Sequence, residues 1–525
     1  TPLKKGEGIK VVQFGVHPVL QGRTDGLAPV CFITGGLHAG GGPYPCLTEQ
    51  ISLSPGSMRQ IVWALVSLPE TVQSYELARQ LCARPWEADL ARIQLTHRSE
   101  CVEVTTGNPE WDAVFTLSQR LAASLFFPPS AHLPNPSFVL ARQPDQGFSL
   151  RGDGSDYNAL WNGVTALDCW YLSRLILPGM VGRVAGLVEN FLSTADSRGQ
   201  LDWKPGLAGQ RSRRMAQPLL AQLAWEVYQI RPNAEWLKKV YPGLIAFFRA
   251  WFSPAHDRDQ DGFPEWEHPY QSGLEFSPLF DVTFPPNQGV EPSLVESPAL
   301  AAMLFGEAAC LLKIASVLGE KSDQEWLKAQ FRHLGDLVEG LWHEEEGIYT
   351  HRDAQTHSVS RGEVLLTFDT RGEYPLQRSL NPPARLQLQL ATQTELTRRI
   401  HIRIRGRDSF GNPLEEEITP QKVSWLRGIG RFTSQTVFSF IDLVEVINLH
   451  TGDTAQLATI DFLVEDISLL LPLWAGIPSA ERADRLVRET LRSRYLQPYG
   501  LLSHPIRSAK QGGRLNPPVV LPWNV

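Results

Sequence analysis

The chain has 525 residues, a formal net charge of −7, 42% hydrophobic and 20% charged residues, which is typical of a folded globular protein of roughly two to four domains. The acidic balance and the lack of a basic run argue against nucleic acid as a partner, and no apolar run is as long as a membrane span, so no membrane partner is expected. The six cysteines, at positions 31, 46, 82, 101, 169 and 310, follow no metal-binding spacing. Unpaired thiols in a reducing compartment, the cytoplasm, are therefore expected.

Residues 1–105 are predicted to form a β-rich N-terminal domain. The short strand-like runs VVQFGV and APVCFITGGL are separated by glycine and proline, and residues 61–70 form a stronger apolar strand. Residues 71–84 have a helical pattern, whereas the alternation in residues 95–105 predicts one more strand. No catalytic constellation is found in this part of the sequence.

Helices dominate the sequence from residue 106 to residue 354. Asn108 followed by Pro109 and Glu110 is typical of a helix start, and amphipathic segments joined by short links then recur. Such a succession indicates stacked α-hairpins. The helices are predicted at residues 109–126, 158–177, 180–194, 216–230, 233–252, 293–318 and 322–342.

Two polar loops between these helices carry candidate substrate-binding residues. In residues 142–163, charged and aromatic side chains precede a helix, which suits the recognition of sugar hydroxyls; a salt-bridged loop that caps the helix through Asp156 is the alternative. In residues 202–217, the Arg211, Arg213 and Arg214 side chains fit a pocket or an exposed surface equally well. The candidates from the two loops are Arg151, Asp153, Asp156, Tyr157, Trp161 and Trp203.

The most unusual stretch is the loop at residues 256–281. It combines acidic, histidine and aromatic side chains with proline and glycine, and it has neither a helical nor a strand period. A long polar loop between helices is usually functional or disordered, and its aromatic rings argue against disorder. We therefore predict an active-site loop, in which Trp266 and Gln271 contact the substrate.

The first half of this loop predicts a calcium site. Carboxylates at alternate positions with Gly262 after the third can surround a hard cation, as in the first half of a calcium loop. The twelfth position is His268 and not the usual Glu, so the segment is not an EF-hand. A solvated acidic turn is the alternative, although its carboxylates would repel one another unless a cation or basic groups neutralise them. The predicted ligands are Asp257, Asp259, Asp261, the Phe263 carbonyl and Glu265.

The second half of the loop presents a candidate general acid. Glu275 stands between Leu274 and Phe276 directly after a glycine turn. These apolar neighbours would desolvate the carboxyl group and raise its pKa, as a general acid requires. A single glutamate in a loop is more often a surface charge.

Together the two halves resemble the catalytic-acid region of glycoside hydrolase family 63 and of related six-hairpin toroid glucosidases, the trehalase-like and glycogen-debranching-type enzymes. In that group a D-x-N-x-N-G-x-P-E calcium loop precedes an S-G-M-D-N-S-P segment whose Asp is the general acid. The chain departs from that pattern in having Glu275 at the acid position. The matching residues are Asp257, Asp259, Asp261, Gly262, Pro264 and Glu265, then Ser272, Gly273, Leu274, Glu275, Ser277 and Pro278. Gln217 followed by Pro218 at a helix start also resembles a pocket-lining motif of that group, which implies that Gln217 contacts the substrate.

Residues 355–462 break the helical pattern with alternation of period two and predict an inserted β-sandwich module. The turn Phe410-Gly411-Asn412-Pro413 separates two of its strands. We expect the module to fold separately, with few contacts beyond its two linkers. It could bind a glycan or a partner, or be purely structural.

The resemblance implies a mainly α protein: an (α/α)6 toroid over residues 106–354 and 463–525, apparently incomplete at its C-terminal end, with a leading β-sandwich fragment and the inserted β-sandwich. It further implies an inverting hydrolase of α-glucosidic or related α-glycosidic bonds in oligosaccharides, with Glu275 as the acid. The base is expected beyond residue 525, so turnover by these residues alone is expected to be low. The alternatives are a non-catalytic glycan-binding or structural toroid and a glycoside phosphorylase, for which Arg151 and Arg211 could bind phosphate.

Overall fold

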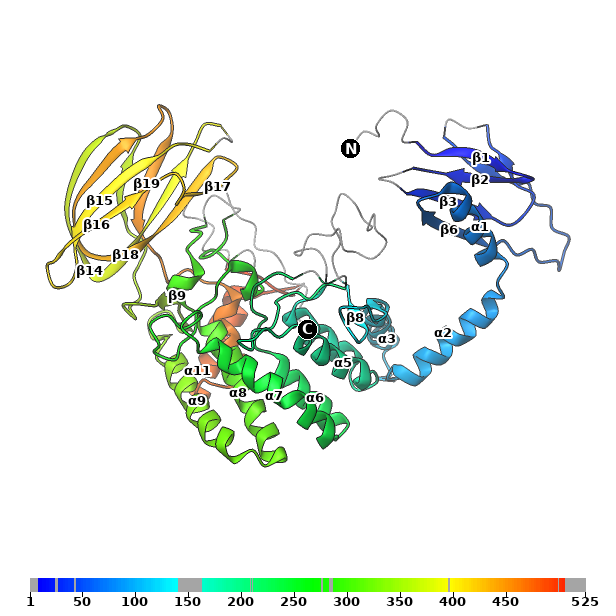
Figure 1. Cartoon of the computed structure of the whole chain (residues 1–525), viewed down its shortest axis with the longest axis horizontal. Coiled ribbons are helices and arrows are strands. Elements are labelled where there is room, and N and C mark those ends of the chain that lie inside the picture. Colours follow the sequence, from blue (N-terminus) through cyan, green and yellow to red (C-terminus); the bar gives the residue numbers. More distant parts are fainter. Residues whose placement is uncertain are drawn as a thin grey trace.

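The computed structural model describes residues 8–23, 27–41, 44–139, 163–207, 209, 211–274, 277–282, 287–394, 397–498 and 500–505. They form an N-terminal sheet, a helical body and a strand module (Figure 1). In Figure 1 the helix α2 (Trp86–Glu100) links the N-terminal sheet to the helical body, and the strand module lies at the opposite side of that body.

The N-terminal sheet has one covered face. Its four antiparallel strands run in the order β1-β2-β3-β6, and helix α1 (Thr71–Cys82) packs on one side, where Val30 and Phe32 share a small core with Tyr75 and Ala78. The covering layer is thus a helix, so the predicted β-sandwich is not found in the described residues. The strands are β1 (Lys10–Phe14), β2 (His17–Gln21), β3 (Ala28–Ile33) and β6 (Trp63–Leu68), with β4 (His38–Ala39) and β5 (Leu47–Thr48) forming a separate pair.

The strand predicted at residues 95–105 is wrong, because α2 extends through most of that range. Proline precedes the helix at position 85, and Glu87 and Asp89 lie in its first turn, where acidic groups are favoured by the helix dipole. Helix-forming residues therefore outweighed a short polar–apolar alternation.

The predicted helices of the helical body are largely confirmed. Helix α3 begins where expected, because the Asn108 side chain accepts hydrogen bonds from the backbone N–H groups of Glu110 and Trp111. The long helices share one hydrophobic core, and α8 and α9 are joined by a tight turn at Gly319, whose φ is +78°. The helices are α3 (Pro109–Ser124), α4 (Ala166–Ile176), α5 (Val181–Leu192), α6 (Leu220–Ile230), α7 (Ala234–Trp251), α8 (Pro298–Leu318), α9 (Lys321–Glu339), α10 (Leu471–Ala475) and α11 (Ala480–Arg485), followed by a π-helix (Leu486–Tyr495).

Within the described part of the chain, α8 alone is long and apolar enough to match a membrane span, which the sequence inspection did not anticipate. Leu300, Leu304, Leu311 and Ile314 are fully buried in the core of the helical body. Packing on neighbouring helices accounts for this apolar composition.

The strand-rich region predicted after residue 355 is confirmed, as a single seven-stranded antiparallel sheet. The long strands β14 and β18 pair along their length with several register shifts, and strands at both ends of the sheet contribute to one hydrophobic core. The strand order is β13-β19-β14-β18-β15-β16, with β17 on β18. The strands are β13 (Val364–Phe368), β14 (Gly372–Ala391), β15 (His401–Arg407), β16 (Pro413–Ile418), β17 (Ser424–Leu426), β18 (Ile429–Asn448) and β19 (Thr454–Thr459).

The expectation that this module makes few contacts beyond its linkers is wrong. Arg385 on β14 forms a buried ion pair with Asp353 of the helical body, and Arg431 on β18 donates to the carbonyl oxygens of Val282 and Asn287. A small hydrophobic cluster also joins Ile460 and Phe462 to the loop after residue 277.

Short strand pairs bring distant loops of the helical body together. Strand β9 (Val295–Glu296) pairs with β12 (Arg352–Asp353), and Glu265 forms an isolated bridge with Glu296. The acidic loop therefore lies beside two segments that are far away in sequence. The remaining short strands are β7 (Phe126–Phe127), β8 (Ser137–Phe138), β10 (Trp342–His343), β11 (Ile348–Tyr349), β20 (Leu496–Gln497) and β21 (Gly500–Leu501), and the short helices are η1 (Pro269–Ser272), η2 (Pro292–Leu294) and η3 (Ile467–Leu470).

Candidate active site and cation site

A cavity of about 1390 Å³ lies in the helical body, larger than most small-ligand sites. Helices α3, α4 and α10 contribute much of its wall, which is mostly apolar. Trp203, Gln217, Tyr270 and residues 272–274 form a further part of the wall. The cavity thus includes two of the predicted substrate-binding residues and the three residues that precede Glu275.

The loop from Asp202 to Gln217 is held in place by its own hydrogen bonds. The Asp202 carboxylate accepts from the backbone N–H groups of Lys204 and Arg213, at 2.9 and 3.0 Å. Asp202 also bridges to Met215. These contacts place Trp203 beside Tyr270, with the two rings stacked at a centroid distance of 6.3 Å.

Two buried polar atoms of this wall have no hydrogen-bond partner among the described residues. They are Nε1 of Trp203, a donor, and Oε1 of Gln217, an acceptor. The other end of the Gln217 amide is used, because its Nε2 donates to the Gln271 carbonyl at 2.9 Å. An unpaired buried polar group is costly, so each of these two atoms requires a partner outside the described residues.

Gln271 is placed as a structural residue of the loop. Its Oε1 accepts from the backbone N–H groups of Glu267 and His268, at 2.8 and 2.9 Å, and its Nε2 donates to the Met215 carbonyl at 3.0 Å. Burial, together with the nearby charge of Arg214, lowers the pKa of His268 to about 4. The neutral His268 ring can therefore accept from the Tyr270 N–H and cap the 3-10 helix Pro269–Ser272.

The other predicted substrate contacts fall elsewhere. Trp266 is 1% exposed and packs edge-on against Trp251 in the core of the helical body, and it does not line the large cavity. Its position favours a packing role. Arg151, Asp153, Asp156, Tyr157, Trp161 and the candidate acid Glu275 lie outside the described residues.

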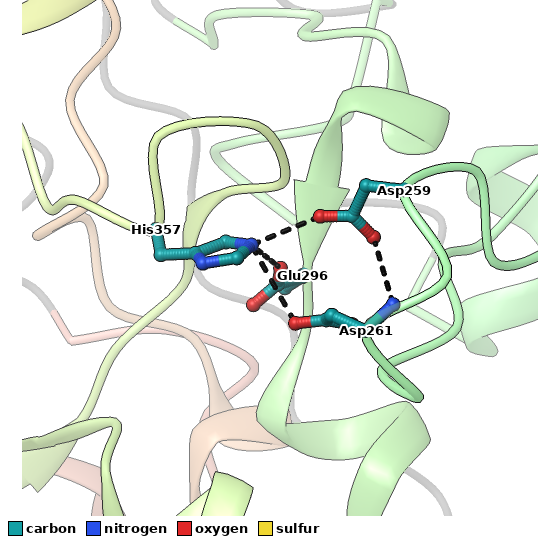
Figure 2. A group of neighbouring side chains, drawn as sticks. All are labelled: Asp259, Asp261, Glu296 and His357. Atoms are coloured by element: carbon teal, nitrogen blue, oxygen red, sulfur yellow. Dashed lines mark hydrogen bonds and ion pairs between the residues drawn. The ribbon is translucent and has the colours of Figure 1, made fainter.

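The acidic loop gathers into a cluster with residues from other segments (Figure 2). Ligand atoms of Asp259, Asp261, Glu296 and His357 all lie within 4.8 Å of one another. Nε2 of His357 lies 2.9 Å from Asp259, 3.5 Å from Asp261 and 3.3 Å from Glu296. Arg352 forms an ion pair with Glu296 and lies 3.6 Å from Asp261.

The turn that carries these carboxylates depends on Gly262. Its φ is +87°, and a Cβ there would lie 2.6 Å from Nε2 of His333, which in turn lies 2.8 Å from the Asp261 carbonyl. A side chain at position 262 would therefore be strained and would displace His333.

The five predicted calcium ligands are only partly brought together. Asp259 and Asp261 are in the cluster, whereas Asp257 and Glu265 are not, and Asp257 accepts from the Gly262 N–H at 3.1 Å. Glu265 is 2% exposed, and neither carboxylate oxygen makes a well-formed hydrogen bond with the described residues.

Burial is the main reason why three carboxyl groups here, those of Asp257, Glu265 and Glu296, have raised pKa values. It raises the pKa of Glu265 to about 8 and that of Glu296 to about 9, against the opposing effect of Arg352. It also raises the pKa of Asp257. A bound cation would reverse these shifts, because it stabilises the charged carboxylates.

Sequence reasoning missed Glu296, His357 and Arg352 in this cluster. Their distance along the chain from the loop hides them from any local spacing rule. The one signal was the histidine at the twelfth position, since a loop that lacks its last carboxylate must take one from elsewhere. The backbone bridge between Glu265 and Glu296 brings a further carboxylate to the loop.

Comparison with known proteins identifies the class of the helical body. Residues 177–397 match the family model of the mannosylglycerate hydrolase MGH1-like glycoside hydrolase domain. This span includes Trp203, Gln217, the acidic loop, Glu275 and His357. This part of the chain is thus a glycoside hydrolase domain, in agreement with the glycoside hydrolase that the resemblance implied.

Solved structures similar to this chain come from Thermus thermophilus. An uncharacterized conserved protein has 15% identity and a TM-score of 0.42, with 74% of this chain and 79% of that chain covered. A GH63 mannosylglycerate hydrolase in complex with glucose has 16% identity and a TM-score of 0.39, with 76% and 82% covered. The same hydrolase with Tris and D-glycerate has 14% identity and a TM-score of 0.41, with 74% and 83% covered. No curated protein sequence matches the chain.

Proposed function

We propose that the chain hydrolyses an α-glucosidic or related α-glycosidic bond in an oligosaccharide. The observation that carries this proposal is the position of residues 272–274. They line the large cavity beside Trp203, Gln217 and Tyr270, and they lead directly into Glu275. Stacked aromatic rings beside polar side chains are features that a sugar ring and its hydroxyl groups would complement.

In this proposal the helical body is a six-hairpin toroid, and Glu275 protonates the leaving oxygen. Leu274, its neighbour, is buried, and an apolar surrounding keeps a carboxyl group protonated near neutral pH. Inversion requires a second carboxylate, about 6.5–9.5 Å away, to activate water. Asp168 is the carboxylate that lines the described cavity wall, but it accepts from the Thr165 hydroxyl at the start of α4, so we assign it no catalytic role.

We further propose that calcium binds to the acidic loop and fixes the segment that precedes Glu275. The residues fit a hard cation, because Asp257 and Glu265 have buried oxygens without a well-formed hydrogen bond in the described structure. Glu296 would supply the carboxylate that the loop lacks at its twelfth position. The ligands would be Asp257, Asp259, Asp261, the Phe263 carbonyl, Glu265 and Glu296. The competing possibility is that Arg352 and His357 neutralise the cluster without a metal ion.

The proposed reaction is tested with α-glucosyl disaccharides, aryl α-glucosides and, because the matching family is named for it, an α-mannosyl glycerate. Proton NMR of the first product formed distinguishes inversion from retention. Release of free sugar without phosphate supports a hydrolase. Cleavage that requires inorganic phosphate would indicate a phosphorylase instead, and binding of sugars without cleavage of any of them would indicate the non-catalytic alternative.

A further inference from the structure

The strand module is fastened to the helical body by two buried arginines. Arg431 and Arg385 are 3% and 4% exposed, and both side chains contact loops outside the module. A guanidinium group carries five N–H donors and keeps its charge, so its burial requires a set of acceptors built around it. The structure supplies these acceptors on the loops next to both candidate sites.

Arg431 contacts the loop that follows Glu275. Its Nε donates to the Asn287 carbonyl at 3.2 Å, and its Nη1 donates to the Val282 carbonyl at 2.6 Å. At Gly289, where φ is +65°, a Cβ would lie only 2.4 Å from Cδ of Arg431. The course of this loop is thus fitted to the arginine side chain.

The same loop has further attachments to the strand module. The backbone N–H of Glu291 donates to the Thr433 hydroxyl at 3.2 Å. The Gln288 amide forms two 2.8 Å hydrogen bonds with the backbone of Asp461, one as donor and one as acceptor. A small core beneath these contacts is formed by Leu279, Phe280, Val290, Val295, Ile460 and Phe462.

Arg385 contacts the loop that leads to the acidic cluster. Its Nε lies 2.6 Å from the Asp353 carboxylate, and its Nη2 donates to the Gln355 side chain at 2.9 Å. Asp353 also accepts from the backbone N–H groups of Gln355 and Thr356, immediately before His357. The module therefore holds one loop of each candidate site.

We propose that Arg431 is a positioning residue, through which the strand module fixes residues 277–282 and 287–291 and thereby the cavity-lining segment 272–274. The connection runs through Ser277, whose N–H donates to the Leu274 carbonyl at 3.2 Å and whose hydroxyl donates to Asp466 at 2.5 Å. Its catalytic consequence rests on the proposed role of Glu275.

The test compares Arg431→Gln and Arg431→Lys with a control on the same module, Arg405→Gln. Arg405 is half-exposed on β15 and pairs with Glu415 at 3.1 Å, so its loss leaves the attachment intact. Hydrogen–deuterium exchange is followed in peptides covering residues 277–291 and 400–407. In parallel, kcat and KM are measured for a substrate with a poor leaving group and for an activated aryl α-glycoside.

For Arg431→Gln we expect faster exchange in residues 287–291 and parent-like exchange in residues 400–407. We expect kcat to fall roughly tenfold or more for the poor leaving group, since small misplacements of a catalytic group are costly, with KM within about twofold and a smaller loss for the aryl glycoside. Arg431→Lys should recover part of the loss, and the control should match the parent. Thr433→Val, which removes only the acceptor for the Glu291 N–H, gives a milder form of the test should Arg431→Gln fail to fold.

Parent-like exchange in residues 287–291, or a loosened loop with unchanged kcat on both substrates, would overturn the positioning role. Glu275→Gln is measured alongside. A fully active Glu275→Gln would refute the general acid, but it would leave the exchange result as an independent measure of whether Arg431 holds the loop.

Discussion

The cavity wall and the acidic loop both contain buried polar atoms that have no hydrogen-bond partner among the described residues, but these atoms differ in charge. In the wall these atoms are neutral, and they belong to Trp203 and Gln217, two residues that line the large cavity. In the acidic loop they are carboxylate oxygens, on Asp257 and Glu265. Neutral groups need only hydrogen bonds, which sugar hydroxyls can supply, whereas carboxylates need positive charge. This difference in charge agrees with the sugar proposed in the cavity and with the cation proposed in the acidic loop.

The largest expected effect is a loss of kcat on substitution of the candidate acid, Glu275. Glu275→Gln keeps the shape of the side chain and removes the proton, so kcat for substrates with poor leaving groups should fall about 10²–10⁴-fold. Activated aryl glycosides should lose less, because their leaving groups need less protonation. Glu267→Gln is the control from the same loop, since the Glu267 carboxylate contacts His256 and Gln271. A Glu275→Gln variant that cleaves a disaccharide at the parent rate contradicts the assignment.

On the cluster side, removal of calcium should destabilise the protein. At a hundredfold excess over Kd a bound ion contributes about 2.7 kcal/mol, which corresponds to several degrees in Tm, and EDTA should abolish it. Glu296→Gln should weaken the binding of calcium, measured by titration calorimetry, whereas Glu345→Gln, an exposed carboxylate, should not. An identical Tm with calcium and with EDTA contradicts the proposal.

Glu307 is a buried carboxylate that, unlike Asp257 and Glu265, has hydrogen-bond partners for both of its oxygens. From α8 it accepts hydrogen bonds from the backbone N–H groups of Ala221 and Gln222, at 2.7 and 3.2 Å, at the start of α6. Burial nevertheless raises its pKa to about 7. The folded state therefore binds this proton more tightly than the unfolded state, and stability is lost as pH rises from about 4.5 to about 7.

At 1.36 kcal/mol per pKa unit, this loss amounts to at most about 3 kcal/mol. Denaturant unfolding at pH 5 and pH 8 should show a smaller decline for Glu307→Gln than for the parent, because the amide does not titrate. Equal declines in the two proteins would show that Glu307 does not titrate in this range.

The smallest expected effect distinguishes Trp203 from Trp266, whose Nε1 atoms both lack a hydrogen-bond partner among the described residues. Trp203→Phe removes the N–H donor of a residue that lines the cavity and should weaken sugar binding by about 1 kcal/mol, with little change in Tm. Trp266→Phe alters the core and should lower Tm while leaving sugar affinity unchanged. Fluorescence titration and calorimetry distinguish the two. Equal affinities in the parent and Trp203→Phe would remove Trp203 from the substrate site.

The helices and strands could be predicted from the sequence more accurately than the contacts between them. Helix boundaries such as Asn108 and the turn at Gly319 depend on local backbone chemistry, and period-two alternation located the strand-rich region. The layer that covers the N-terminal sheet could not be predicted this way, because it depends on which element reaches Val30 and Phe32. In the candidate sites, Asp259 and Asp261 were visible through their spacing. Glu296 and His357 were not, since strand pairing between distant segments brings them to the loop.

Roles assigned from residue type were the least secure. Trp266 and Gln271 both have side chains that are suited to contact a sugar. However, Trp266 is a core residue, and the Gln271 amide forms its hydrogen bonds with backbone groups of its own loop and of Met215. A side chain's type indicates what it can bind, whereas only its neighbours show what it has already bound.

The close fit between Gly289 and Arg431 limits how the strand module can be transferred to another protein. An engineer who wished to move the strand module into a different glycosidase could not cut only at its two linkers. The recipient would need a residue without a β-carbon opposite the arginine and a glutamine able to pair with the backbone at the module's exit. The transferable unit is thus the sheet together with a piece of its host, and a graft that omits this piece should give a chain that folds in parts but does not join them.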